Sequence, residues 1–64
     1  MPSPVRFDEL RKLMEAYGWR LDRINGSHHV FDKPGQRSYP VPVHNGKVQY
    51  GYYRKIQNLI SGGD

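Results

Sequence analysis

Apolar side chains near the start of the chain recur with the spacing of a helix. Each has another of the set three or four positions away, and charged side chains lie between them: Phe7, Leu10, Leu13, Met14 and Tyr17. This spacing places them on one face and predicts an amphipathic helix over residues 7–17. The helix begins either at the capping pair Ser3-Pro4 or nearer Phe7, and Gly18 supplies the residue type that commonly ends a helix.

After Gly18 the apolar and polar positions alternate, a pattern typical of half-buried strands. The alternation predicts three antiparallel strands over residues 19–24, 28–33 and 38–43. Asn25-Gly26 and Pro34-Gly35 supply the turns between them. Alternation leaves open whether Val30 or Phe31 faces the core.

The third strand contains two prolines of the same parity, Pro40 and Pro42. Proline has no N–H to donate to a neighbouring strand, so we expect this strand at an edge of the sheet. Residues 45–51 are expected to form a loop. The helical spacing then returns and predicts a second helix over residues 52–60.

The element order is helix, three strands, helix, and it predicts an α+β fold. A two-layer sandwich buries this pattern, with a three-stranded antiparallel sheet and both helices on one face. This is the element order of a double-stranded-RNA-binding domain. A chain of 64 residues has room for one domain, expected to span residues 1–64.

The composition of the chain indicates its cellular setting and the kind of partner that it binds. Ten Lys and Arg against six Asp and Glu give a net charge of +4, which favours an anionic partner, either nucleic acid or an acidic protein. No cysteine is present, so disulfides and thiolate metal sites are excluded and a reducing, cytoplasmic setting is expected. With no apolar leader and no apolar run near 20 residues, we expect a soluble protein that does not enter a membrane.

The most informative chemical feature is the run Gly26-Ser27-His28-His29, in which two adjacent histidines follow a predicted turn at the start of a predicted strand. Histidine exchanges a proton near neutral pH because its unperturbed pKa is about 6.5. Neighbouring residues of a regular strand point to opposite faces, so His28 and His29 are not expected to work as a pair. His44, at the end of the third strand, is the better partner for His28, although His29 stays open. Adjacent histidines without cysteines or a carboxylate pair do not predict a metal site, and no cofactor is expected.

Several segments form a recognisable set in order and spacing: Gly18-Trp19, Arg23, Gly26-Ser27-His28-His29, Phe31, Pro34, Val41-Pro42-Val43-His44 and Gly51. In these segments the chain resembles the HicA toxins, and the resemblance covers residues 10–60. Members of this family have a fold similar to double-stranded-RNA-binding domains. They act as ribosome-independent mRNA interferases and are paired with a HicB antitoxin. The resemblance implies that His28 is the catalytic histidine.

The expected function is therefore the toxin of a type II toxin–antitoxin system, a metal-independent endoribonuclease. His28 would be the general base that takes the 2′-hydroxyl proton, with His44 as a possible second acid or base. The expected partners are mRNA and a HicB-like antitoxin covering His28, and the free toxin is expected to be a monomer. Two rivals remain, a non-catalytic RNA-binding module of the same fold and an interaction protein for an acidic partner.

Basic side chains from neighbouring strands and loops are expected to surround the histidines and contact RNA phosphates. Arg23 is the strongest candidate because it precedes His28 in the same hairpin. Ser27 either shapes the turn or donates to a phosphate oxygen. The expected RNA-binding residues are Arg23, Ser27, His29, Lys33, Arg37 and Lys47, with Arg20 also on this surface.

Overall fold

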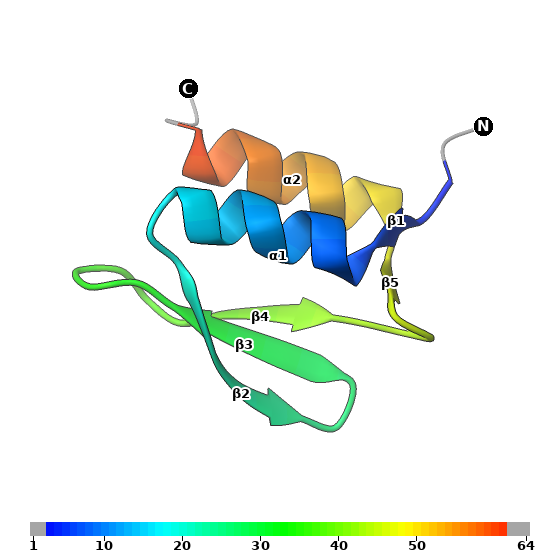
Figure 1. Cartoon of the computed structure of the whole chain (residues 1–64), viewed down its shortest axis with the longest axis horizontal. Coiled ribbons are helices and arrows are strands. Elements are labelled where there is room, and N and C mark those ends of the chain that lie inside the picture. The colour runs from blue at the N-terminus through cyan, green and yellow to red at the C-terminus, as the bar shows by residue number, and fades with distance from the viewer. Residues whose placement is uncertain (1–2, 62–64) are drawn as a thin grey trace.

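The computed structural model describes residues 3–61, with two helices on one side of an antiparallel sheet (Figure 1). The elements in chain order are β1 (Val5–Arg6), α1 (Phe7–Ala16), β2 (Arg20–Asn25), β3 (His28–Asp32), β4 (Tyr39–Pro42), β5 (Lys47–Val48) and α2 (Tyr50–Ile60). The predicted α+β fold is confirmed, including the placement of both helices on one face. Neither helix within residues 3–61 is long and apolar enough to cross a membrane.

The main sheet has the strand order β2-β3-β4, with both neighbouring pairs antiparallel. Gly26 and Ser27 form the two-residue loop between β2 and β3, and Gly26 has a φ of 63°. Positive φ at the first loop residue alone is the pattern of a type II′ turn, which matches the twist of the strands it joins. The proline-containing strand β4 lies at an edge of the sheet, as predicted.

A β-bulge at Asp22 interrupts the alternation of β2. Leu21 pairs with Phe31, but the next residue of β3, Val30, pairs with Arg23. Asp22 is therefore an extra residue, and it reverses which face the rest of β2 presents. Because of the bulge, Arg23 shares a face with Val30 rather than with Phe31.

A second, two-stranded sheet lies beside the first and was not predicted. It joins β1 to β5, with Val5 opposite Val48 and Arg6 opposite Lys47. Asn45 and Gly46 have φ of 53° and 73°, and two successive positive φ values are the pattern of a type I′ turn. The predicted loop over residues 45–51 is therefore wrong, because this segment forms a hairpin turn, β5 and the start of α2.

The core lies between the sheet and the helices. Its buried side chains come from both layers: Phe7, Leu10, Met14, Trp19, Phe31, Val41, Val43, Val48, Ile56 and Ile60. Phe31 is fully buried in this cluster, whereas Val30 is buried on the opposite face of the sheet, outside it. Both residues that competed for the core are thus buried, on different faces. The helix start is also settled, because α1 begins at Phe7.

Candidate functional site

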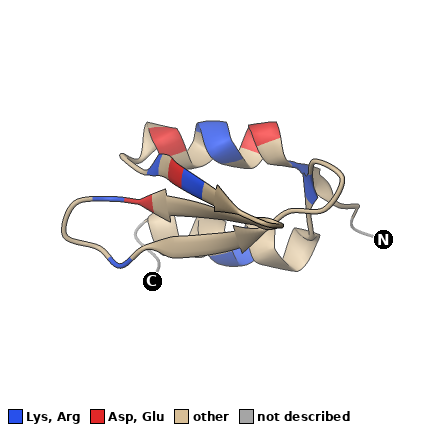
Figure 2. Cartoon of the chain, turned by 90° about the horizontal axis from the view of Figure 1, so that it is seen from below, with Lys and Arg blue, Asp and Glu red and all other residues tan. Residues whose placement is uncertain are grey.

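The face of the main sheet turned away from the helices carries the candidate site. Phe31 and Val41 belong to the core, so their neighbours along β3 and β4 point the other way. Two rows cross this face in register, and we call them together the open face: Asn25, His28 and Pro42 in one row, and Arg23, Val30 and Pro40 in the next. Seen from this side, the charged residues of the sheet lie mainly along β2, and most of β3 and β4 is uncharged (Figure 2).

His28 is exposed at the first position of β3, directly after the Gly26-Ser27 turn. The backbone beside it is tied to β4, because the Val43 N–H donates to the Ser27 carbonyl oxygen over 2.7 Å. The main chain at His28 is thus held between a tight turn and a neighbouring strand while its ring remains accessible. This combination suits a residue that must meet a large substrate in a fixed position.

Arg23 lies on the open face one row away from His28. Diagonal neighbours on a sheet are separated by roughly 7–8 Å, which a long arginine side chain can span. Arg23 is paired with Asp22 at 2.6 Å, and its side chain is 58% exposed. Exposed ion pairs of this kind contribute at most about 1 kcal/mol to stability. A phosphate can therefore compete with Asp22 for the guanidinium group of Arg23.

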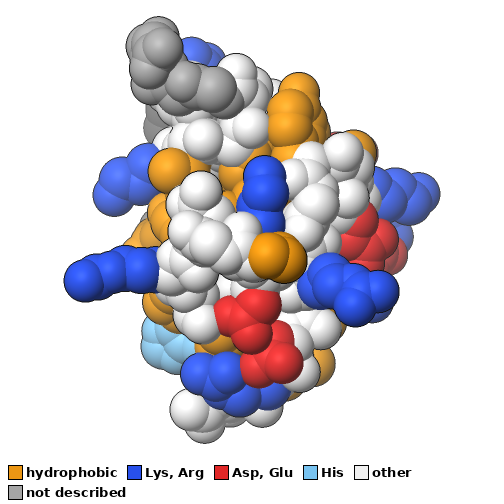
Figure 3. Space-filling model, turned by 90° about the vertical axis from the view of Figure 1, so that its left-hand side faces the viewer, with side chains coloured by type: hydrophobic (Ala, Val, Ile, Leu, Met, Phe, Trp, Pro, Cys, Tyr) orange, Lys and Arg blue, Asp and Glu red, His pale blue; other side chains and the backbone are white. Residues whose placement is uncertain are grey.

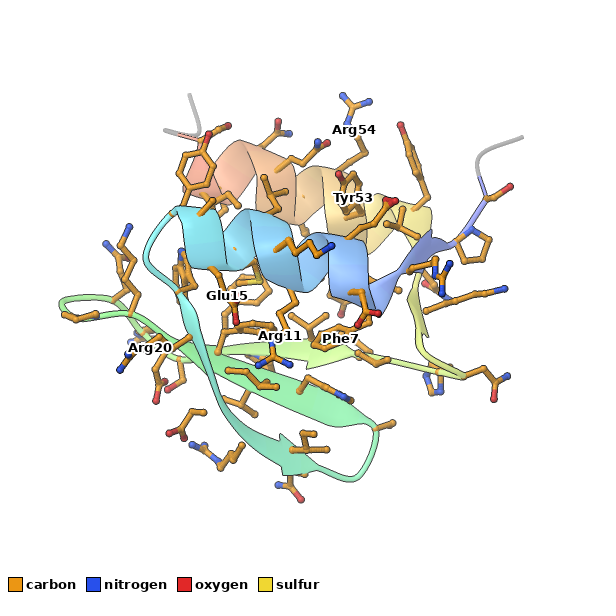
Figure 4. The ribbon with its side chains drawn as sticks, in the orientation of Figure 1. Phe7, Arg11, Glu15, Arg20, Tyr53 and Arg54 are labelled. Atoms are coloured by element: carbon orange, nitrogen blue, oxygen red, sulfur yellow. The ribbon has the colours of Figure 1, made fainter. Side chains whose placement is uncertain are left out.

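His29 faces the helices, on the opposite side of the sheet from His28. The centroid of its ring lies 4.5 Å from that of the Phe7 ring. Phe7 is the first residue of α1 (Figure 4). Its Nδ1 is buried and has no hydrogen-bond partner among the described residues. The expectation that His28 and His29 face apart is confirmed, and His29 belongs to the contact between the sheet and α1. Its expected contact with RNA remains a prediction.

His44 lies just beyond β4, at the same end of the sheet as His28. It comes two residues after Pro42, which is paired with His28 across the sheet. Two backbone hydrogen bonds of 2.9 Å each join His44 to Lys47 across the type I′ turn. Both His44 and Lys47 are exposed, so the structure gathers these two candidates near His28.

Lys33 and Arg37 lie toward the other end of the sheet. Lys33 is five residues along from His28, roughly 17 Å at about 3.3 Å per residue. Its side chain runs over Gly18, where an added Cβ would stand 3.4 Å from Lys33 Cε. Arg37 belongs to the loop between β3 and β4, at the end of the molecule that Figure 3 shows, where Lys and Arg side chains alternate with acidic ones. The expected basic residues thus fall into two groups rather than one surface around the histidines.

One basic residue near the site was not singled out from the sequence. Arg6 lies in β1 directly opposite Lys47. A strand of two residues is too short to show an alternating pattern, so the sequence did not predict this pairing. Within residues 3–61, no three His, Asp or Glu side chains gather where they could hold a metal ion.

These features define a small basic α+β domain with an exposed histidine and a nearby arginine on its open sheet face. The chain matches the family described as the HicA toxin of bacterial toxin–antitoxin systems over residues 7–59, nearly its whole length. It belongs to the HicA toxin family and is thus a toxin. Membership of this family implies an antitoxin partner. No curated protein and no solved structure matches the chain.

Proposed function

We propose that this toxin is a metal-independent endoribonuclease that cleaves mRNA, with His28 as the general base. The observation that carries the proposal is the placement of His28, exposed at the end of the open face on a backbone fixed by the turn and by β4. Membership of the HicA toxin family supports an RNA substrate. An mRNA substrate would place the action of the toxin in the cytoplasm.

The reaction requires a base that removes the proton of an RNA 2′-hydroxyl group. That oxygen then attacks the adjacent phosphorus and the bond from phosphorus to the 5′-oxygen breaks. The products would be a 2′,3′-cyclic phosphate and a free 5′-hydroxyl end. Neutral His28 would take the first proton, and a general base of this kind contributes roughly 10²- to 10⁴-fold to the rate.

Two further residues have roles in this proposal. Arg23, diagonal to His28 on the open face, would bind the scissile phosphate and stabilise the charge that develops on it. His44, exposed at the same end of the sheet, would give a proton to the leaving 5′-oxygen. His29 takes no part in the proton transfers because it packs against Phe7 on the other face.

The antitoxin would inhibit the toxin by covering His28 and Arg23. Acidic or hydrogen-bonding groups of the partner would satisfy the cationic side chains there. Strand pairing with the outer edge of β4 is disfavoured, because Pro40 and Pro42 offer no N–H to a partner strand. The free toxin is accordingly expected to be a monomer, and the partner is expected to recognise side chains of the open face.

The test is cleavage of a long unstructured RNA by the purified toxin in excess EDTA. We expect cleavage by the wild-type protein and a loss of at least about 100-fold in His28→Ala. Lys12→Ala is the control, because Lys12 is exposed on α1 in the helical layer. Equal cleavage by wild type and His28→Ala would refute the role of His28. RNA binding by both folded proteins without cleavage by either would favour the non-catalytic RNA-binding module.

A further inference from the structure

A hollow lies where β1, the start of α1 and the turn before β5 meet. Its volume is about 580 Å³, and its lining residues are Pro4, Arg6, Phe7, Asp8, Asn45, Gly46 and Lys47. The Phe7 N–H donates to the Gly46 carbonyl oxygen over 2.8 Å, which joins the helix start to the turn on one side of the hollow. The hollow is thus built from two segments far apart in the chain.

Two cationic side chains line this hollow from directly opposed positions. Arg6 and Lys47 are register partners in the β1–β5 sheet, and like charges in such positions destabilise a strand pair. Among the ion pairs found within residues 3–61, neither Arg6 nor Lys47 takes part, although Asp8 also lines the hollow. The repulsion between the two cations is therefore not relieved by a carboxylate in contact with them, and a bound anion would relieve it.

The hollow lies at the end of the sheet where His28 is found. Lys47 forms a β-bridge with His44. His44 comes two residues after Pro42, and Pro42 is paired with His28 across the sheet. An RNA strand whose reacting linkage lies at His28 can therefore continue past His44 toward the hollow.

We propose that Arg6 and Lys47 bind a backbone phosphate of the RNA substrate in this hollow, away from the linkage that is cleaved. The proposal rests on the proposed function, since it takes RNA as the substrate. The planar guanidinium group of Arg6 can bind a phosphate through two parallel hydrogen bonds, and the ammonium group of Lys47 adds a point charge. Such a contact fixes the register of the RNA on the protein without reading its sequence. Asp8 weakens the site because its carboxylate repels the phosphate.

The test measures binding of a fluorescent single-stranded RNA to His28→Ala protein by anisotropy, over a series of salt concentrations. Arg6→Gln and Lys47→Gln are added to this background, because glutamine keeps part of the stem and removes the charge. Each is expected to weaken binding about tenfold at low salt and to reduce the salt slope by about 0.7. Asp8→Asn is expected to tighten binding.

The controls remove the same charges from the helical layer. Arg54 points away from the sheet (Figure 4), and Lys12 is exposed on α1, so Arg54→Gln and Lys12→Gln should leave the salt slope nearly unchanged. If Arg6→Gln matches Arg54→Gln while the wild-type toxin still cleaves RNA, the phosphate site is refuted and the proposed function stands. If the His28→Ala protein binds no RNA at low salt and the wild type cleaves none, the proposed function fails and the phosphate site fails with it.

Discussion

The turn that precedes His28 is expected to tolerate no side chain at Gly26 without a loss of stability. A Cβ added at Gly26 would meet no atom within 4 Å, so the cost of Gly26→Ala comes from the backbone alone. Gly26 has a φ of 63°, and the positive-φ conformation of this turn position costs other L-residues roughly 1–3 kcal/mol. The more restricted unfolded chain returns about 0.4–1 kcal/mol. The expected net loss is therefore about 1 kcal/mol.

Gly51→Ala provides a control of opposite sign. Gly51 lies in the first turn of α2, its φ is not positive, and an added Cβ there also meets nothing within 4 Å. Alanine in a helix is favoured over glycine by up to about 1 kcal/mol. Since the two glycines have equal space but different backbone conformations, the difference between the variants isolates the conformation.

The assay is thermal unfolding followed by circular dichroism. A change of 1 kcal/mol shifts Tm by roughly 4–8 °C in a domain of this size, so Gly26→Ala should fall by that amount and Gly51→Ala should rise. A Gly26→Ala protein as stable as wild type, or both variants shifting in the same direction, would refute the reasoning. At temperatures where Gly26→Ala is fully folded, any loss of RNA cleavage reports on the position of His28 rather than on unfolding.

Two other predictions concern the core and its edge. Phe31 is fully buried between the layers, so Phe31→Ala should cost about 3–5 kcal/mol, against a total stability of roughly 3–10 kcal/mol at 0.05–0.15 kcal/mol per residue. Urea unfolding should show Phe31→Ala losing a large part of its stability, with a much lower unfolding midpoint than wild type, and Phe31→Leu losing clearly less. A small loss in Phe31→Ala would contradict this packing. Burial, and secondarily the charge of Tyr52, raise the pKa of Tyr39 above its usual value of 10.0. The folded state therefore holds this proton more tightly, and stability should be full below about pH 10 and fall as the pH rises above it. Tyr39→Phe should lessen that fall, whereas Tyr17→Phe, which changes an exposed tyrosine, should not.

The elements that the sequence predicted are those with enough length to show a period. The face of α1 repeats over three turns, and Gly18 has a positive φ of 91° just beyond its end. β1 and β5 have two residues each, too few for alternation to be distinguished from chance. The bulge at Asp22 was also missed, although Leu21 and Ile24 are apolar at a spacing of three, which a regular strand does not produce.

The candidate site was predicted in part, for similar reasons. Alternation was enough to separate His28 from His29, because both lie in one regular strand. The grouping of the basic residues depended on strand length and pairing instead. Lys33 follows the last residue of β3, at the opposite end of that strand from His28, and Arg6 lies beside Lys47 only because β1 pairs with β5. Contacts between segments far apart in the chain leave no local pattern to read.

The direct test of the central claim is the chemistry of the RNA ends made by the toxin in excess EDTA. After the cut is mapped, the nucleotide whose 2′-hydroxyl would attack is replaced by its 2′-deoxy form in an otherwise identical RNA. We expect the wild-type toxin to leave 2′,3′-cyclic phosphate and 5′-hydroxyl ends on the first RNA and to leave the second uncut at that position. Undiminished cleavage of the 2′-deoxy RNA would contradict the account, because His28 would then have no 2′-hydroxyl proton to take.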